Sequence, residues 1–284
     1  MSKYKLALIG YPLEHSLSPI LYKAAFKDLD LDGSYEILPT RPEDLVSRIK
    51  HLRAEKYYGF NVTIPHKVPT TLFLSRYDEN VNIMGSVNTV KIEEDSNLTG
   101  YNTDVYGFME AFDKNINFED KKAVILGTGG AARAVCAGLY NLGVREVTFC
   151  TRNIINSAET LELLRSKFID MKISVLQNSL IDTFEDVSIL VNTTPVGMKK
   201  FDEDTCPLKD KTIDSLKEDA IVYDIVYNPY ETALISKARK FNRKYICGLD
   251  MLVHQAVRAV EIWTGKTPDW KTMKISALET YLLK

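Results

Sequence analysis

Asn61, Thr63 and Lys67 are the residues of this chain whose types and spacing first point to chemistry. Residues 60–64 alternate apolar and polar side chains, which predicts a strand, and Pro65 ends it because proline lacks a backbone donor and fixes φ. Asn61 and Thr63 project from one face of that strand, and Lys67 follows on a turn. Two uncharged hydrogen-bonding groups beside an ammonium suit a small hydroxylated or carboxylated ligand. A plain strand end with a solvated lysine is the alternative for this segment taken alone.

Asp104 is a candidate partner for that lysine. It stands just before a run of apolar residues with helical spacing at 105–112, so Thr103 or Asp104 could simply cap a helix. In the functional interpretation, the Asp104 carboxylate lies beside Lys67, keeps the ammonium charged and orients it for proton transfer. Lys67 and Asp104 are therefore the predicted catalytic pair.

The first predicted strand covers residues 5–9, and two serines, Ser16 and Ser18, follow it. Ser18 stands before Pro19, and this pair predicts a helix start, with the serine capping free amides and the proline in the first helical position. Ser16 has no such structural explanation. Because α/β proteins bind ligands in loops that follow strand ends, Ser16 is a candidate binding residue.

A dinucleotide-binding fingerprint begins at Gly127. A strand at 121–126 runs into Gly-Thr-Gly-Gly-Ala-Ala, and a helix with one apolar face follows, which is the G-x-G-x-x-A form of the motif. Gly127 permits the tight turn, Gly129 lets the backbone approach a pyrophosphate, and Ala132 allows close helix–strand packing. The helix N-terminus attracts the phosphates.

The next strand, at 146–150, ends in Thr151, Arg152 and Asn153. An NAD site usually has an acidic residue here for the ribose 2′-hydroxyl, and this chain has none. Arg152 can instead pair with a 2′-phosphate, so the sequence favours NADP. A solvated loop arginine is the alternative, because no second basic residue stands nearby.

The whole chain alternates strands and helices, which predicts an α/β fold with a mostly parallel sheet. Further strands are expected at 35–38, 58–64, 87–92, 173–176, 189–192, 220–223 and 245–247. Helices are expected from Pro42 onwards, with Leu45, Ile49 and Leu52 on one face, and at 251–263 and 271–283.

Composition limits the class of protein. The 284 residues suffice for one large or two modest domains. With 36 basic and 38 acidic residues and no run of one sign, we expect no nucleic-acid partner. No apolar run approaches the roughly 18 residues that span a bilayer, so we expect no membrane association. No signal segment precedes the first strand, so we expect a cytoplasmic location. The four scattered cysteines form no metal pattern, and no metal is expected.

Taken together, these stretches resemble the shikimate dehydrogenase family over nearly the whole chain. The segments that carry the resemblance are 16–19, 61–67, 85–89, 102–104, 127–133, 192–198, 224–229 with Thr232, and 248–255. The resemblance implies two domains: a substrate and catalytic α/β domain at 1–103 and 249–284, and a Rossmann NADP-binding domain at 104–248. It also implies reversible reduction of 3-dehydroshikimate to shikimate by NADPH, a step of aromatic amino acid biosynthesis.

The resemblance further assigns roles to individual residues. Lys67 and Asp104 would be the catalytic pair. Substrate contacts would come from Ser16, Ser18, Asn61, Thr63, Asn88, Tyr227 and Gln255. Cofactor contacts would come from Gly127, Gly129, Gly130, Ala131, Thr151, Arg152, Asn153, Thr193, Pro195, Met198, Val226, Gly248 and Met251.

Two departures from the family pattern stand out. The cofactor-selecting stretch usually reads Asn-Arg-Thr with another basic residue close behind, whereas here Thr151-Arg152-Asn153 is followed by Ile154 and Ile155. Asp250 stands where many members have glycine, close to the expected nicotinamide position.

Three alternatives remain open at this point. The first is a quinate/shikimate dehydrogenase that uses NAD or NADP. The second is another two-domain Rossmann enzyme with an essential lysine, such as a methylenetetrahydrofolate dehydrogenase, although the serine pair and Tyr227 fit a polyhydroxy acid better. The third is a non-catalytic cofactor sensor, which would not need Lys67 and Asp104 together. The oligomeric state, a homodimer included, is not determined by the sequence.

Overall fold

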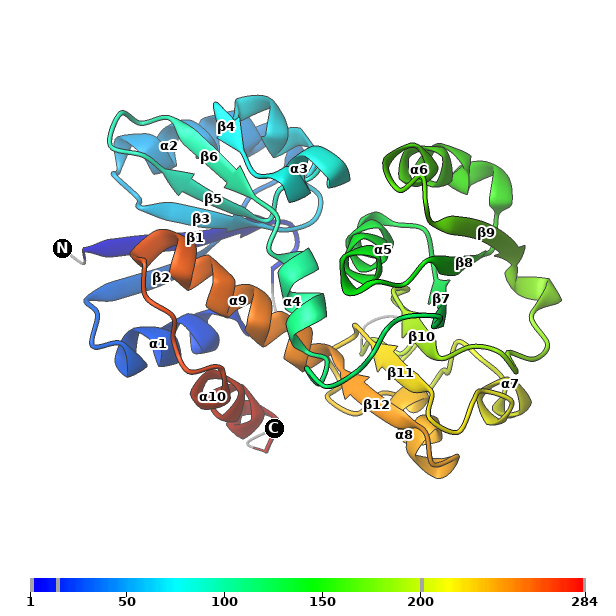
Figure 1. Ribbon diagram of the computed structural model, residues 1–284. Coiled ribbons are helices and arrows are strands. Elements are labelled where there is room, and N and C mark those ends of the chain that lie inside the picture. The colour runs from blue at the N-terminus through cyan, green and yellow to red at the C-terminus, as the bar shows by residue number, and fades with distance from the viewer. Residues whose placement is uncertain (1–2, 14–15, 200–201, 283–284) are drawn as a thin grey trace. The chain divides into compact units, whose positions relative to one another are not determined.

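The computed structural model describes residues 3–13, 16–199 and 202–282 (Figure 1). The chain divides into two compact units, a first unit of Met1–Gly107 with Val253–Lys284 and a second unit of Phe108–Leu252. The boundaries fall inside helices α4 (Asp104–Glu110) and α9 (Gly248–Thr264), four residues beyond the expected ones. The predicted two-domain α/β fold is confirmed. No helix among the described residues is both long and apolar enough to cross a bilayer.

The first unit is built on a mixed six-stranded sheet with the order β2-β1-β3-β5-β6-β4. Its strands are β1 (Tyr4–Gly10), β2 (Gly33–Pro39), β3 (Gly59–Val62), β4 (Arg76–Tyr77), β5 (Thr89–Ile92) and β6 (Leu98–Tyr101). β1 is parallel to β2 and β3, and β4 is parallel to β6. β5 runs antiparallel to both of its neighbours. The expected parallel character therefore holds for most of this sheet.

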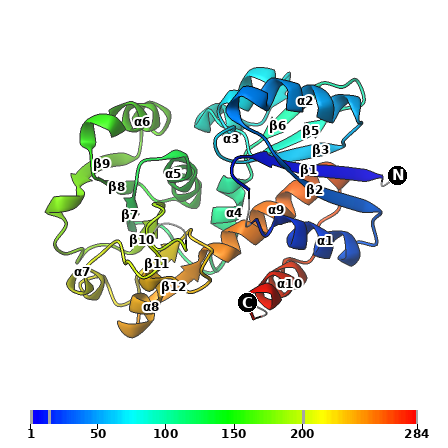
Figure 2. The same cartoon turned by 180° about the vertical axis from the view of Figure 1, so that it is seen from behind.

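Helices cover both faces of that sheet (Figure 2). They are α1 (Ser18–Asp28), α2 (Leu45–Ala54), α3 (Glu79–Met84), the part of α9 from Val253, and α10 (Trp270–Leu282), with 3₁₀ turns at Pro42–Asp44 and Pro69–Phe73. The predicted apolar face of α2 is confirmed, because Leu45, Ile49 and Leu52 are buried in one cluster with Phe60 and Val90. Each such side chain contributes about 1.5–3 kcal/mol on burial.

Three elements of the first unit were not predicted: β4, β6 and α3. β4 has only two residues, too few for alternation to be visible. β6 is Leu-Thr-Gly-Tyr and is stabilised by pairing with β5. α3 has only six residues, and the Asp78 carboxylate caps it by accepting from the Val81 amide at 2.8 Å. These elements rest on pairing and capping rather than on hydrophobic periodicity.

The second unit is a doubly wound sheet with the order β12-β11-β10-β7-β8-β9, and all of its pairs are parallel. The strands are β7 (Lys122–Leu126), β8 (Glu146–Thr151), β9 (Lys172–Gln177), β10 (Ile189–Asn192), β11 (Ile221–Asp224) and β12 (Lys244–Cys247). The helices are α5 (Gly130–Leu142), α6 (Ile154–Lys167), α7 (Asp210–Asp214) and α8 (Ala233–Lys240), with a 3₁₀ turn at Asn178–Leu180. The crossover helices lie on both faces of the sheet, α5 and α6 on one and α7 and α8 on the other (Figure 1). This is the Rossmann strand order.

Gly59 offers a stability test of the packing between β3 and α9. The Trp263 indole Nε1 donates to the Val90 carbonyl at 3.0 Å, directly over this glycine. A Cβ at residue 59 would collide with the indole and come within 2.5 Å of the Val90 oxygen. We expect Gly59→Ala to lower the free energy of unfolding by about 2 kcal/mol in urea unfolding followed by circular dichroism.

Gly130→Ala is the matched control, because a Cβ there has no heavy atom within 4 Å. Its effect should stay within about 0.5 kcal/mol. Equal unfolding midpoints for the two variants would contradict the packing described for Gly59.

Candidate active site

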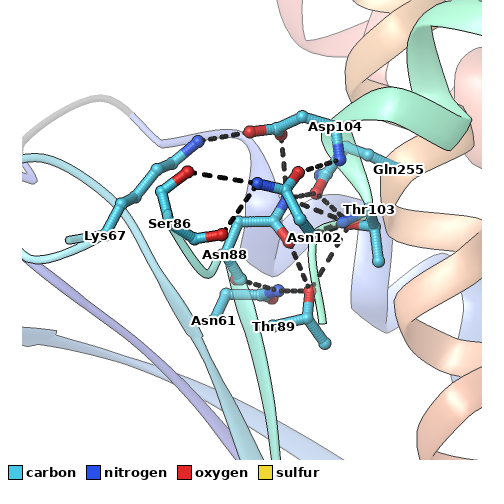
Figure 3. A network of polar contacts seen from close by, with 9 residues as sticks. All are labelled: Asn61, Lys67, Ser86, Asn88, Thr89, Asn102, Thr103, Asp104 and Gln255. Carbon is cyan, nitrogen blue, oxygen red and sulfur yellow. Dashed lines mark hydrogen bonds and ion pairs between the residues drawn. The ribbon is translucent and has the colours of Figure 1, made fainter. Parts of the chain in front are cut away.

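Lys67 and Asp104 form an ion pair in the first unit, with 2.6 Å between Lys67 Nζ and Asp104 Oδ2 (Figure 3). The two side chains are 31% and 16% exposed, so the pair is reachable but shielded. The turn that carries the lysine is anchored by the buried His66, whose Nε2 lies 2.7 Å from the Thr40 carbonyl oxygen. Because a carbonyl only accepts, this His66 nitrogen carries the hydrogen. The hydrogen bond between His66 and Thr40 thus fixes the turn that carries Lys67.

The second oxygen of the Asp104 carboxylate is held by Asn88. The Asn88 Nδ2 donates to Asp104 Oδ1 at 2.8 Å, and its Oδ1 accepts from the Thr103 backbone amide at 2.8 Å. That backbone donor fixes which end of the Asn88 amide faces the carboxylate. Both Asp104 oxygens therefore accept hydrogen bonds, Oδ2 from Lys67 and Oδ1 from the positioned amide of Asn88.

A wider polar network surrounds these groups (Figure 3). Asn102 donates to the Ser86 carbonyl at 3.0 Å, and its Oδ1 accepts from the Asp104 amide at 3.1 Å. Gln255, on α9, accepts at Oε1 from the Thr103 hydroxyl at 3.3 Å. Asn61 donates to the Asn88 carbonyl at 3.1 Å and so joins β3 to the same network. Residues far apart in the chain are brought around one carboxylate.

The structure contradicts the capping role predicted for Ser18. Ser18 is already the first residue of α1, the N-cap position is Leu17, and no side chain caps it. The Ser16 hydroxyl instead accepts from the Ser18 amide at 3.2 Å. The prediction that Ser18 caps the helix is therefore wrong, because a serine inside the first turn cannot reach the free amides, while one two residues earlier can. Pro19 does lie in the first turn, as expected.

In the second unit, the glycine loop after β7 has the geometry of a phosphate site. Gly127 has φ +101°, a left-handed conformation that favours glycine. A Cβ there would lie 2.9 Å from the Thr193 hydroxyl, which itself donates to the Leu126 carbonyl. Gly129 and Gly130 have no heavy atom within 4 Å of a Cβ position. The first amides of α5 are thus open to a pyrophosphate, and the residues present fit a dinucleotide.

Arg152 is an exposed cation at the end of β8. Its neighbours are engaged locally: the Thr151 hydroxyl accepts from the Asn153 amide at 3.3 Å, and Asn153 Oδ1 caps α6 by accepting from the Asn156 amide at 3.2 Å. Ile155, in the first turn of α6, is 83% exposed. The guanidinium is therefore the charged group that this turn offers to a ligand.

A buried carboxylate, Asp224, joins the loops that follow β10 and β11. It accepts from Asn192 Nδ2 at 2.9 Å, the Thr232 hydroxyl at 2.7 Å and the Val226 amide at 3.1 Å. Burial raises the pKa of Asp224 to about 6, against the opposing effect of these three hydrogen bonds. The two loops are also joined directly, because the Lys199 amide donates to the Asn228 carbonyl at 3.0 Å.

Comparisons with known proteins agree with this arrangement. Residues 8–90 match the family described as the shikimate dehydrogenase substrate binding domain, and residues 248–274 match the shikimate 5′-dehydrogenase C-terminal domain. A shikimate dehydrogenase (NADP(+)) from Methanocaldococcus jannaschii is 40% identical over 281 residues, with 96% of each chain covered. The chain belongs to the shikimate dehydrogenase family.

Solved structures of related enzymes have the same fold. A shikimate dehydrogenase in complex with NADP+ superimposes with a TM-score of 0.88 at 36% identity, over 98% of this chain and 96% of the other. Quinate dehydrogenase from Corynebacterium glutamicum in complex with NAD reaches 0.89 at 26% identity, over 97% and 99%. The family resemblance predicted from the sequence is confirmed.

The predicted substrate and cofactor residues of this shikimate dehydrogenase family member lie, with one exception, in different units. The first unit holds Lys67 and Asp104 and all but one of the predicted substrate residues, namely Ser16, Ser18, Asn61, Thr63, Asn88 and Gln255. The exception is Tyr227, which follows β11 in the second unit. The second unit also holds every predicted cofactor residue: Gly127, Gly129, Gly130, Ala131, Thr151, Arg152, Asn153, Thr193, Pro195, Met198, Val226, Gly248 and Met251. These lie at or just after the carboxyl ends of β7, β8, β10, β11 and β12, at one edge of the parallel sheet. Gly130 and Ala131 already belong to the start of α5, and Gly248 and Met251 to the start of α9.

Sequence reasoning missed several members of these networks. Ser86, Thr89, Asn102 and Thr103 bond within the first unit, and Asp224 and Thr232 within the second, yet none was assigned a site role. The available signal was compositional: polar residues cluster at 86–89 and 102–104 in segments that are otherwise buried. Such residues need partners, which a single sequence does not name.

Thr232 tests the Asp224 network. Its hydroxyl donates to Asp224 and accepts from the Ile235 amide at 3.3 Å as the N-cap of α8. We expect Thr232→Val to lower the free energy of unfolding by about 2–3 kcal/mol, since it removes a cap and a donor to a buried carboxylate. Thr232→Ser keeps both bonds and should remain within about 1 kcal/mol of the parent. Urea unfolding measures both, and equal losses would speak against the network.

Proposed function

We propose that this chain is an NADP-dependent shikimate dehydrogenase that catalyses the reversible reduction of 3-dehydroshikimate to shikimate in aromatic amino acid biosynthesis. The observation that carries the proposal is the Lys67–Asp104 pair, with Asp104 held on its other oxygen by Asn88. Membership of the family and the full-length similarity to shikimate dehydrogenases support the substrate and the cofactor.

The second unit is the proposed cofactor domain. The open amides at the start of α5 would hold the pyrophosphate, and Arg152 would pair with the 2′-phosphate. When bound, the nicotinamide supplies or accepts the hydride of the reaction. The loops after β10 and β11, joined through Asp224, would line the remainder of the cofactor with Thr193, Met198 and Val226.

Lys67 is the proposed proton donor in the direction of reduction. As hydride reaches the carbonyl carbon, negative charge develops on the oxygen, which the ammonium stabilises and then protonates. The lysine loses one proton and regains it from solvent, which its 31% exposure permits. In the oxidation direction the neutral amine takes the hydroxyl proton.

Asp104 would orient Lys67 and accept from the reacting hydroxyl. The remaining substrate groups, a carboxylate and further hydroxyls, would be held by Ser16, Ser18, Asn61, Thr63, Asn88, Gln255 and Tyr227. These are short hydroxyl and amide side chains with one phenol, which suits a polyhydroxylated acid. The first unit is accordingly the proposed substrate and catalytic domain.

The second candidate is a quinate/shikimate dehydrogenase that uses NAD or NADP. Two observations favour it: Arg152 is followed by apolar Ile154 and Ile155 instead of a second cation, and quinate dehydrogenase with NAD shares the fold at a TM-score of 0.89. Either enzyme would work in the cytoplasm on small molecules, without a nucleic acid, a membrane or a metal, and a homodimer is compatible with both.

The role of Lys67 is tested by Lys67→Ala. We expect kcat to fall by about 10²–10⁴-fold, because the general acid is lost, while the KM for NADP stays unchanged. Lys114→Ala is the control, since Lys114 also pairs with a carboxylate at 2.6 Å but is 67% exposed and belongs to the second unit. Weakened NADP binding with kcat intact would remove Lys67 from the chemistry.

The function itself is tested by initial rates of nicotinamide reduction at 340 nm, with shikimate or quinate crossed with NADP or NAD. We expect fast turnover with shikimate and NADP, and slow turnover in the other three combinations. Comparable rates with quinate or NAD would move the protein to the second candidate. Cofactor binding without turnover in any combination would leave a sensor as the better interpretation.

A further inference from the structure

Asn61 lies on β3 with almost all of its hydrogen-bonding capacity in use. Its Nδ2 donates to the Asn88 carbonyl at 3.1 Å and to the Thr89 hydroxyl at 3.0 Å, and its Oδ1 accepts from the Tyr35 hydroxyl at 2.8 Å. An amide has two donor hydrogens and two acceptor lone pairs. Both hydrogens and one lone pair are therefore occupied, and the side chain is only 6% exposed.

The orientation of this amide is determined by its partners. The Asn88 backbone carbonyl can only accept, so the nitrogen of Asn61 must face it and the oxygen must face Tyr35. A flipped amide would set two acceptors against each other at the Asn88 carbonyl. What remains for a ligand is one lone pair on Oδ1, which only a donor can use.

Tyr35, on β2, keeps its proton as a consequence of its surroundings. Burial, and next the neighbouring Tyr22, raise the pKa of Tyr35 well above its usual 10, and a hydrogen bond from Ser18 opposes them only in part. The ring stacks on that of Tyr22, with 4.1 Å between centroids and 13° between planes. The phenol is thus a protonated donor whose position is set by packing.

Tyr22, on α1, differs from its stacking partner in one respect. It is completely buried, and among the described residues its hydroxyl has no hydrogen-bond partner of ordinary geometry. Its ring contributes packing between Tyr35 and Trp263, whose centroid is 5.6 Å away. The Asn61 side chain nevertheless lies near enough to this hydroxyl to oppose, in part, the rise that burial causes in the pKa of Tyr22. The stacked pair therefore contains one hydroxyl with a well-formed hydrogen bond to Asn61 and one without.

We propose that Tyr35 is a positioning residue that, together with the Asn88 carbonyl, holds Asn61 as an obligate acceptor, so that the substrate site selects a hydroxyl group at this point and disfavours a carbonyl or carboxylate oxygen. The inference rests on the proposed function, because it takes Asn61 to contact the substrate. It adds a residue from a neighbouring strand, remote from the ion pair, to the determinants of substrate choice.

The test compares Tyr35→Phe with Tyr22→Phe, two deletions of one hydroxyl from the same stacked pair. Tyr35→Phe should raise the KM for shikimate about fivefold, as expected for a neutral hydrogen bond, and leave kcat and the KM for NADP within about twofold. Tyr22→Phe should leave all three within about twofold, since its hydroxyl makes no hydrogen bond of ordinary geometry. Equal effects of the two substitutions, or a loss of kcat in Tyr35→Phe with KM unchanged, would overturn the proposal.

Inhibition by single-deoxy analogues of shikimate gives the specificity directly. The parent enzyme should bind one analogue, the one that lacks the hydroxyl received by Asn61, several-fold more weakly than the other analogues. In Tyr35→Phe this discrimination should shrink, whereas in Tyr22→Phe it should persist. Unchanged discrimination in Tyr35→Phe would contradict the proposed selection.

A readout without substrate separates this inference from the proposed function. In ¹⁵N NMR spectra the Asn61 side-chain NH₂, bonded through both hydrogens, should exchange slowly with solvent in the parent and in Tyr22→Phe, and faster in Tyr35→Phe. Equal exchange in all three proteins would overturn the positioning role of Tyr35. If exchange responds as expected but the parent neither binds nor turns over shikimate, the proposed function fails while the positioning of Asn61 stands.

Discussion

The buried amide of Asn88 is the constraint on which the first unit's polar network depends. Its oxygen accepts from the Thr103 backbone amide, and its nitrogen donates to the Asp104 carboxylate. These two bonds hold the start of α4 against the start of β5. Asn88 is 3% exposed, and losing its bond to Thr103 would leave that buried backbone amide without its partner, at a cost of about 1–3 kcal/mol. Asn88 fixes the position of the Asp104 carboxylate. The flexible side chain of Lys67, on a turn that is otherwise open to solvent, therefore has a defined partner.

In the second unit a buried carboxylate, Asp224, likewise joins separate segments of the chain. Asp224, fully buried at the end of β11, gathers donors from β10, from its own loop and from the cap of α8. The difference in burial has a chemical consequence. Asp104, 16% exposed and bonded to an ammonium, can serve as a functional carboxylate, whereas Asp224 has its pKa raised to about 6 by burial and serves to join loops.

How far prediction succeeded depended on the range of the interactions involved. Strand, glycine turn and helix at 121–142 were readable because each signal is local: an apolar strand, a left-handed glycine and an apolar helix face. The buried face of α2 was readable for the same reason. The strand expected to run to Ile64 and stop at Pro65 ends earlier, at Val62, so Thr63 lies just beyond β3. The capping prediction for Ser18 was wrong because a shift of a single residue in where α1 begins decides which hydroxyl reaches an amide. The strands β4 and β6 were missed because pairing with strands elsewhere in the chain stabilises them, and α3 because six residues are too few to show a helical period.

The sequence by itself determined the alternation that makes an α/β fold, the nucleotide-binding loop and the identity of the family, since these reside in residue types at fixed local spacing. Only the tertiary structure decided which polar groups meet. Asn88 and Gln255 are 167 residues apart and lie 3.5 Å from each other, and Tyr35 reaches Asn61 from a different strand. The physical reason is that a buried donor or acceptor must find a partner, but any of many polar residues could satisfy it, and the packing of helices on the sheet selects which one does.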